Sequence, residues 1–258
     1  MLTALVNFLR RMPMAIEQDD DERHDEDAPA AVADLDVRDG WLEGIGVARD
    51  TSPKHSRSPR LERQGPALVV THCTSTLHGS APALLKAIRK ADGREASWHV
   101  LIDEHGGITQ SITFTRAAWH AGSASAAKVD LGGLLVSVNS ASVGIELVNA
   151  GEVRLVGREY RAWPFAGNAT RKPGPIVPVT QTVNVGKRLY HAYTVHQVEA
   201  WRRVMRALLE AYPALGHDVT LVAQDGKRRS LPGWRVGHVD VDPARKSDPC
   251  VHWRWPAP

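Results

Sequence analysis

At 258 residues and 43% apolar side chains, the chain can bury one substantial core, and single mixed α/β domains of this size are common. No run of about 20 consecutive apolar residues occurs, so no membrane-spanning helix is predicted. The formal net charge is +3, but residues 17–27 alone contribute −7, and the rest of the chain therefore carries +10. This excess of positive charge favours binding to anionic polymers, but the charge alone does not indicate which polymer.

The first 40 residues are expected to form a flexible acidic leader. Residues 17–27 hold eight acidic side chains and one arginine, and such a segment cannot bury enough apolar surface to offset the entropy lost on ordering. Residues 1–13 have no basic residue ahead of their apolar ones, and Asn7 interrupts them, so they do not fit a standard secretory signal. We therefore expect the protein to be cytoplasmic as synthesised.

Four apolar segments predict the strands of a central sheet. Residues 67–73 and 143–148 are short β-branched runs of the kind found in buried strands. Residues 98–102 and 108–112 flank Asp103-Glu-His-Gly-Gly107, which predicts a β-hairpin with a glycine-containing turn. Because a hairpin is antiparallel, we expect a mixed sheet and not a purely parallel one.

Two helices are predicted beside these strands. Ser80 and Pro82 are typical of a capped helix start. Thr194-Val-His-Gln197 is a capping-box sequence, and apolar residues follow it at helical spacing: Val198, Trp201, Met205, Leu208 and Tyr212. The predicted fold class is α/β, a single domain over residues 41–258 with a central mixed β-sheet flanked by helices. Within it, residues 150–193 form an insertion with one hairpin, 153–155 against 160–163, and a Gly/Pro-rich loop.

One segment near the C-terminus gathers metal-binding side chains. Residues 237–249 hold His238, several carboxylates including Asp248, and Lys246. Imidazole with carboxylate suits zinc, and a catalytic zinc site needs a third protein ligand from elsewhere. His72 is the best candidate because it lies near the end of a buried strand, where a neutral imidazole needs a partner. Taken alone, either histidine is more typical of a hydrogen-bonded core residue than of a metal ligand.

Two further charged residues have both a chemical and a structural interpretation. Glu146 lies inside the apolar run 143–148, and a buried carboxylate is costly without a partner. A salt bridge would explain it; beside a metal it could act as a general base. Lys246 could stabilise an oxyanion, or it could be an ordinary solvated lysine.

These residues belong to five short blocks that occur in the order found in a known family. The blocks are Val70-Thr-His72, Ser97 through Ile108, Ala118-Trp-His-Ala-Gly122, Ser142-Val-Gly-Ile-Glu146, and Gly237 through Pro249. Over about residues 45–255 the chain resembles the amidase-2 type N-acetylmuramoyl-L-alanine amidases, in the superfamily of the peptidoglycan recognition proteins. The resemblance implies an amidase-2-like fold and a zinc hydrolase that cleaves the bond between N-acetylmuramic acid and L-alanine.

The resemblance also implies the roles of particular residues. His72, His238 and Asp248 would bind one Zn²⁺ per chain, and Glu146 and Lys246 would flank the water and the scissile carbonyl. The side chains expected to line the substrate groove are Trp98, His99, Trp119 and His120, with core packing as the alternative for the tryptophans. The chain departs from the family at Trp98, where relatives often carry tyrosine, and at Cys250, which could replace Asp248 as a ligand.

Two other functions stay open at this point. The chain could be a peptidoglycan-binding module without activity, although such modules typically lack a zinc ligand, or a zinc hydrolase of a different amide. We expect peptidoglycan or muropeptides as partners, no nucleic acid, and a monomer. Recycling of muropeptides, phage lysis and delivery by a secretion machine all suit an amidase without a standard signal, which would reach the wall after lysis or by non-classical export.

Overall fold

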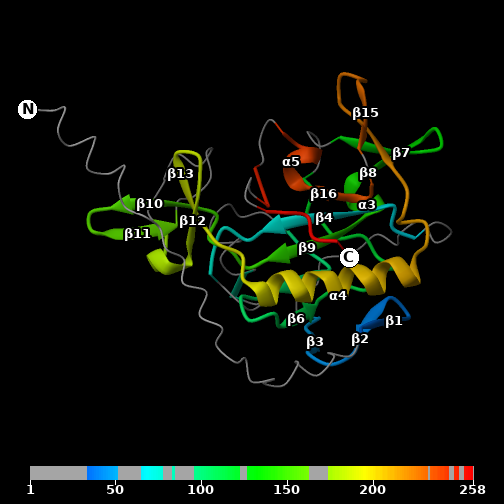
Figure 1. Cartoon of the computed structure of the whole chain (residues 1–258). Helices are drawn as coiled ribbons and strands as arrows, with labels where there is room; N and C mark the ends of the chain where they lie inside the picture. Colours follow the sequence, from blue (N-terminus) through cyan, green and yellow to red (C-terminus); the bar gives the residue numbers. More distant parts are fainter. Residues whose placement is uncertain are drawn as a thin grey trace, which may run out of the picture. The chain divides into compact units, whose positions relative to one another are not determined.

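A mixed β-sheet lies at the centre of the computed structural model (Figure 1). The structure describes residues 34–51, 65–77, 83–84, 96–122, 127–162, 174–231, 233–243, 247–249 and 253–257. Within these ranges the central sheet has six strands, which are, in spatial order, β16 (Arg235–Gly237), β4 (Leu68–Cys73), β9 (Ser142–Leu147), β5 (Val100–Ile102), β6 (Ile108–Gln110) and β3 (Val47–Arg49). Only β5 and β6 pair antiparallel among these neighbours. The predicted α/β class with a mixed sheet is confirmed.

The antiparallel pair is the predicted hairpin. Val100 pairs with Gln110 and Ile102 with Ile108. The side chain of Asp103 closes the turn, because its Oδ1 accepts hydrogen bonds from the backbone N–H groups of His105 and Gly107, both at 2.8 Å. An aspartate that bonds to its own turn in this way supplies the local signal that places a hairpin here.

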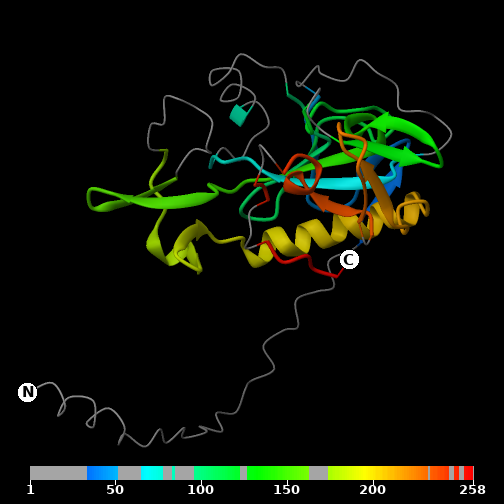
Figure 2. The ribbon, with the colours of Figure 1, turned by 90° about the horizontal axis from the view of Figure 1, so that it is seen from above.

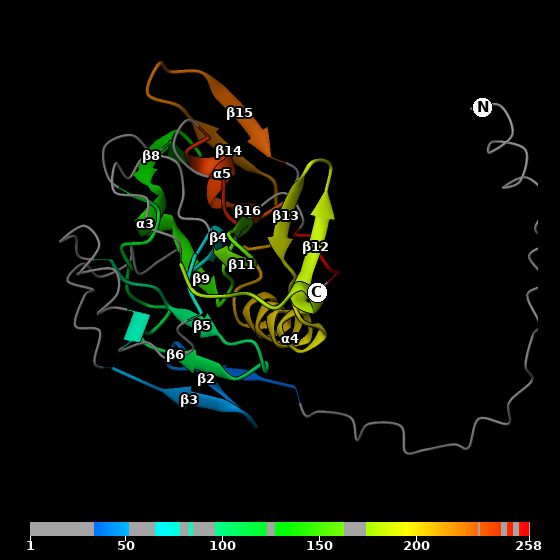
Figure 3. The same cartoon turned by 90° about the vertical axis from the view of Figure 1, so that its left-hand side faces the viewer.

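The central strands β4 and β9 are covered on both faces. All residues of β4 are buried, and so are all residues of β9 except the half-buried Glu146. The long helix α4 (Val195–Ala211) covers one face, where the indole Nε1 of Trp201 donates to Thr71 Oγ1 at 3.2 Å. Figures 1 and 3 show α4 and the short helix α5 (His238–Val241) on opposite sides of β4.

The start of α4 follows the predicted capping box. Gln197 N donates to Thr194 Oγ1 at 3.0 Å, and Thr194 N donates to Gln197 Oε1 at 3.2 Å. These two bonds satisfy backbone donors that a helix start otherwise leaves without partners. The other predicted helix, which begins at Ser80, lies almost wholly outside the described residues.

The segment between β9 and α4 forms a second sheet. Its strands, in spatial order, are β11 (Glu159–Ala162), β10 (Glu152–Val156), β13 (Arg188–His191) and β12 (Thr182–Val185), and the 3-10 helix η1 (Val179–Gln181) precedes β12. The pairing of β10 with β11 is the predicted hairpin, although its last residue, 163, is not described. The pairing of β12 with β13 is a second hairpin in the insertion, which was not predicted from the sequence.

A third sheet lies at the other end of the central strands (Figures 1 and 2). Its strands, in spatial order, are β15 (Arg228–Leu231), β14 (Val219–Val222), β7 (Lys128–Leu131) and β8 (Leu134–Ser137). The short helix α3 (Val138–Ala141) connects β8 to β9 and starts with Ser137 as its cap. The third sheet is therefore joined to β9 of the central sheet through α3.

Strands β1 (Asp36–Arg38) and β2 (Trp41–Glu43) form a small antiparallel pair. Leu35 and Leu42 are buried in the main core. The folded domain therefore begins before residue 40, inside the segment that was expected to be a flexible leader. Residues 1–33 are not described. None of the described helices is long and apolar enough to cross a membrane.

Candidate metal centre

Three buried side chains, one from β4 and two from residues 237–249, meet on the α5 side of β4. His72 and His238 are each 2% exposed and Asp248 is 6% exposed. Asp248 Oδ2 lies 3.0 Å from His72 Nδ1 and 3.2 Å from His238 Nδ1. One ligand atom of each residue lies within 4.8 Å of the others. These are the three residues that the sequence predicts as metal ligands, and the fold brings them together.

Strand pairing and two backbone contacts hold this cluster in place. Gly237 pairs with Thr71 across β16 and β4, so the residues that follow them, His238 at the start of α5 and His72 in β4, are neighbours, with ring centroids 4.5 Å apart. A Cβ on Gly237 would lie 2.7 Å from Pro249 Cδ, and only glycine therefore lets the 248–249 segment approach this closely. Val239 N donates to Asp248 O at 3.0 Å, which fixes the backbone that carries the carboxylate.

The electrostatics of Asp248 favour a bound cation. Burial by itself raises the pKa of the Asp248 carboxyl, but hydrogen bonds and charge from His238 and His72 outweigh it and hold the pKa well below its usual range. A buried carboxylate with two imidazole nitrogens is a donor set of the kind that first-row divalent metals take. Donor atoms on a tetrahedral ion with bonds of about 2.0 Å are separated by roughly 3.3 Å, close to the spacing found here.

His120 continues this cluster away from the carboxylate. His120 Nδ1 lies 2.9 Å from His72 Nε2, and His120 Nε2 lies 3.0 Å from Ser142 Oγ. A Cβ on Gly144 would lie 2.5 Å from His120 Cγ, so the imidazole occupies the space that a side chain there would fill. The ring that was predicted to bind substrate thus contacts a predicted ligand directly.

Neither Ser142 nor Gly144 is given a role from the sequence, although both lie in the block 142–146 and a signal for both is present. Side chains alternate between the two faces of a strand, so residues 142, 144 and 146 share one face of β9. The position of Glu146 in the strand therefore indicates that residues 142 and 144 face the same site.

Glu146 lies on the same face of the sheet as His72. The two are register partners across the parallel strands β9 and β4, and Leu101 is the partner of Glu146 on the other side. Register partners in a sheet project their side chains to the same face. Glu146 is also the residue of β9 that solvent partly reaches. The structure thus places this carboxylate beside the metal-ligand cluster.

Trp98 and His99 lie inside the fold. His99 is buried, and both ring nitrogens bond to backbone: Nδ1 accepts from Gly144 N at 2.9 Å, and Nε2 donates to Arg116 O at 2.8 Å. Trp98 is 1% exposed and packs with Leu84, Leu101 and Val148. Their burial does not fit the expected substrate contacts, since neither ring reaches a surface.

Trp119 is half-buried, and its backbone is fixed by two bonds to Ser97. It therefore stays a candidate for substrate contact. Lys246 and Cys250, the predicted oxyanion residue and the alternative ligand, lie outside the described residues. Cys73 is buried, and it follows His72 directly in β4, so its thiol projects to the opposite face of the strand.

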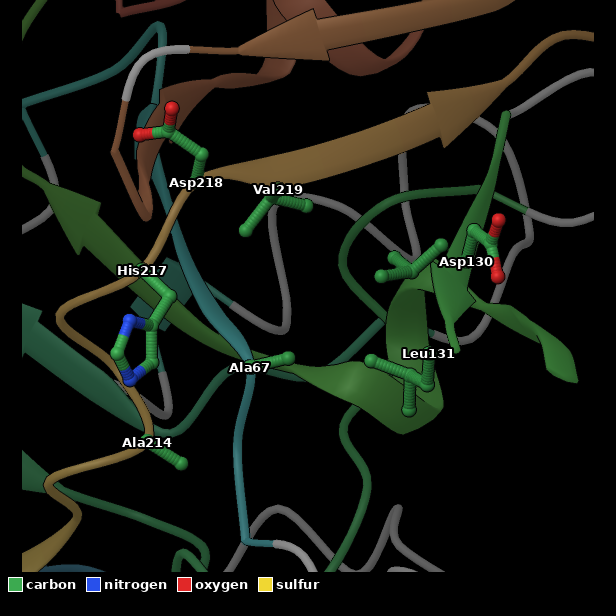
Figure 4. Close-up of a pocket in the computed structure, with 8 residues that line it drawn as sticks. Ala67, Asp130, Leu131, Ala214, His217, Asp218 and Val219 are labelled. Carbon is green, nitrogen blue, oxygen red and sulfur yellow. The ribbon is translucent and has the colours of Figure 1, made fainter. Parts of the chain in front are cut away.

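A pocket of about 420 Å³ lies away from the metal-ligand cluster, near the start of β4 (Figure 4). Its lining residues are Ala67, Val129, Asp130, Leu131, Ala214, His217, Asp218 and Val219. Its two carboxylates are already engaged, because Asp218 accepts from Gly233 N at 2.8 Å and Asp130 pairs with Arg228. Figure 4 shows the Asp218 carboxylate and the His217 ring turned away from each other. This pocket offers no convergent group for catalysis.

Comparison with known proteins gives a family match over most of the chain. The family model described as N-acetylmuramoyl-L-alanine amidase, Amidase_2, matches residues 62–251. The chain is 25% identical over 231 residues to the 1,6-anhydro-N-acetylmuramyl-L-alanine amidase AmpD of Salmonella typhimurium strain LT2, covering 84% of this chain and 89% of that protein. It is 24% identical over 236 residues to AmpD of Escherichia coli strain K12, covering 85% and 92%. A crystal structure of an AmpD derivative is similar, with a TM-score of 0.47, 24% identity, and coverage of 85% and 94%.

Proposed function

Because the chain belongs to the Amidase_2 family of N-acetylmuramoyl-L-alanine amidases, we propose that it hydrolyses that amide bond with one Zn²⁺ held by His72, His238 and Asp248. The observation that carries this proposal is the buried cluster itself, in which a carboxylate oxygen lies 3.0 and 3.2 Å from two imidazole nitrogens. A buried carboxylate and two imidazoles, brought together from β4 and from residues 237–249, match the three-ligand set of a catalytic zinc site.

The chemistry that Zn²⁺ supplies in such a site is a water pKa lowered to about 7 and a polarised carbonyl. In the proposed reaction, Glu146 takes a proton from the attacking water and gives it to the nitrogen of L-alanine as the C–N bond breaks. The products are a free carboxylate on the lactyl group and a free peptide amine. Lys246 supplies positive charge to the oxygen that becomes negative when water adds to the carbonyl.

The position of Glu146 supports its role as the proton carrier. Its side chain is on the face of the sheet that carries His72, and it is partly open to solvent while its neighbours in β9 are buried. A carboxylate there can meet both the water and the leaving amine. Trp119, half-buried in the block after β6, is proposed to contact the sugar or the peptide of the substrate.

The proposed substrates are muropeptides. The AmpD relatives are named for 1,6-anhydro-N-acetylmuramyl-L-alanine, and we propose soluble muropeptides carrying this sugar as the first substrates to test. Whole peptidoglycan and amides without a muramoyl group should be assayed beside them. Turnover of unrelated amides at an equal rate would favour a zinc hydrolase with another substrate.

Metal content and peptide release, measured on the same preparations, test the proposed function. We expect about one zinc per chain, loss of peptide release when a chelator removes the metal, and recovery when zinc returns. Asp248→Asn should lose zinc while circular dichroism stays unchanged. Asp225→Asn is the matched control, since Asp225 is an exposed acid paired with Lys227, and it should retain both zinc and activity. Full activity in metal-free protein or in Asp248→Asn would overturn the proposal.

A further inference from the structure

We infer that His120 is a positioning residue: with Ser142 it holds His72 in the tautomer that presents a bare Nδ1 to the metal. This inference rests on the proposed zinc site. It assigns His120 to the support of a ligand and not to the substrate groove. The evidence is a directed chain of hydrogen bonds that runs from a backbone carbonyl to the ligand.

The donor and acceptor roles in this series of hydrogen bonds are fixed at Ser142. Ser142 Oγ lies 2.5 Å from Val138 O. A carbonyl oxygen only accepts hydrogen bonds, so the one hydroxyl proton of Ser142 lies between these two oxygens. Toward its other neighbour, His120, the same hydroxyl can only accept.

The donor and acceptor roles of the two ring nitrogens of His120 follow from those of Ser142. Its Nε2, 3.0 Å from Ser142 Oγ, must carry a proton to make a bond with an acceptor. A neutral imidazole protonated on Nε2 has a bare Nδ1, and this atom lies 2.9 Å from His72 Nε2. His72 Nε2 is therefore the donor in the bond to His120.

The last link in the chain is the metal ligand. A neutral His72 protonated on Nε2 has a lone pair on Nδ1, and that atom lies 3.0 Å from Asp248 Oδ2. A lone pair facing a carboxylate oxygen at this distance is favourable only when a cation, either a proton or a metal ion, lies between them. A proton there makes the hydrogen bond that lowers the pKa of Asp248, and a metal ion would replace that proton. The chain of bonds thus prepares His72 to bind a metal through Nδ1 before any metal arrives, as a hydrogen bond on the distal nitrogen does for metal-bound histidines in general.

Neighbouring residues keep His120 in the position that this series of hydrogen bonds requires. Asn139 Oδ1 accepts from His120 N at 3.1 Å and from Ala121 N at 2.8 Å, which fixes the backbone. Gly144 leaves room for the ring. His238, in contrast, has a buried Nε2 without a hydrogen-bond partner among the described residues. The support is therefore specific to His72.

The first test is zinc affinity, measured by chelator competition on a set of matched variants. In His120→Asn the amide oxygen stands at the same bond distance from Cα as Nδ1 and can still accept from His72, so affinity should stay near wild type. His120→Leu keeps the bulk but removes the acceptor, and we expect a 10–100-fold loss, the usual cost of removing such a partner. Ser142→Ala should give a smaller loss in the same direction.

Thr71→Val is the control for the general effect of removing a buried hydroxyl group. Thr71 is the neighbour of His72 in β4, and its hydroxyl accepts from Trp201 on the opposite face of the sheet. This variant should lose stability without losing zinc affinity. Zinc affinity equal to wild type in both His120→Leu and Ser142→Ala would overturn the inference.

The second test reads the tautomers directly and needs no activity. Long-range ¹H–¹⁵N spectra of the zinc-loaded wild type should show His120 and His72 both protonated on Nε2, and the metal-free protein should show the same tautomer for His120. His120 protonated on Nδ1 would overturn the inference even if zinc binds. A wild type that binds no zinc but shows His120 protonated on Nε2 would instead contradict the proposed function and leave the chain of bonds intact.

Discussion

Glu146 and His72 are register partners across the parallel strands β9 and β4, and their side chains project from the same face of the central sheet. His72 is buried, whereas Glu146 is partly exposed at the same level of the sheet. One strand therefore presents a proposed metal ligand, and its neighbour presents a partly exposed acidic side chain.

Glu146→Gln should abolish most of the turnover and leave the metal in place. The amide keeps the shape of the side chain but cannot take a proton from water, so we expect kcat to fall by about 10²–10⁴-fold, the usual contribution of a general base. KM and zinc content should change little. Initial rates of peptide release from a 1,6-anhydro-muropeptide, with zinc measured on the same sample, give both numbers.

Glu152→Gln is the control for this variant. Glu152 is an acidic residue of β10 that pairs with Arg154 at 2.7 Å, and its loss should leave kcat at the wild-type value. If Glu146→Gln also retained wild-type kcat, the carboxylate would be a structural group and the proton carrier would have to be sought elsewhere.

The central part of the fold could be predicted because its signals are local. β4 and β9 are short apolar runs, β5 and β6 flank a turn closed by Asp103, and α4 begins at a capping box. Strand β12, in contrast, is largely exposed and is held by its pairing with β13. No residue of β12 is buried, so apolar periodicity does not mark it as a strand. The two-residue turn Gly186-Lys187, which joins it to β13, is the local signal that could have placed it.

The candidate site could be predicted in part, because some of its residues are charged within an apolar run or lie close together in one polar segment. Glu146 is a carboxylate in an apolar run, and His238 and Asp248 lie in one short polar segment. The bonding partners of histidines were not predictable, because they depend on register and backbone. His99 bonds to backbone groups of Gly144 and Arg116, and His120 bonds to His72 and Ser142, so two similar residues have different surroundings.

Gly144→Ala should weaken zinc binding through His120. The new Cβ would lie 2.5 Å from His120 Cγ, so the ring must move away and its bond to His72 must lengthen. Forcing a methyl group into a packed site costs about 1–3 kcal/mol of the free energy of unfolding. Denaturant unfolding and chelator competition measure the two effects. Gly216→Ala, where the nearest atom is Pro213 O at 3.6 Å, should change neither; an unchanged Gly144→Ala would mean that the ring has room to move.

Trp119→Ala should raise KM more than it lowers kcat. The side chain is half-buried, so it can offer an aromatic surface to sugar or peptide without touching the reacting atoms. Loss of one aromatic contact is worth about 1 kcal/mol, which corresponds to a rise in KM of about fivefold. Steady-state kinetics on the anhydro-muropeptide measure both constants. Trp255→Ala, which removes a tryptophan that packs with Trp201 and Trp253, is the control and should leave KM unchanged.

His191 should make the protein less stable as the solution becomes mildly acidic. Burial lowers the pKa of His191 below its ordinary value of 6.5, and its Nδ1 accepts a hydrogen bond from Ala150 N at 3.2 Å, which requires the neutral ring. Below about pH 6.5 the unfolded chain therefore binds a proton that the folded chain resists, and the free energy of unfolding must fall as pH falls.

The dependence on His191 can be isolated with His191→Asn. The amide oxygen can still accept from Ala150 N but cannot be protonated, so the loss of stability between about pH 7.5 and about pH 5.5 should be smaller than in the wild type. Glu104, whose Oε1 lies 3.8 Å from His191 Nε2, has a pKa raised by burial, and its protonation at lower pH acts in the opposite direction. Comparing the variant with the wild type at each pH removes most of that contribution. His196→Asn, at an exposed histidine at the start of α4, should follow the wild type. Equal slopes for His191→Asn and the wild type would show that the buried ring does not set the acid sensitivity.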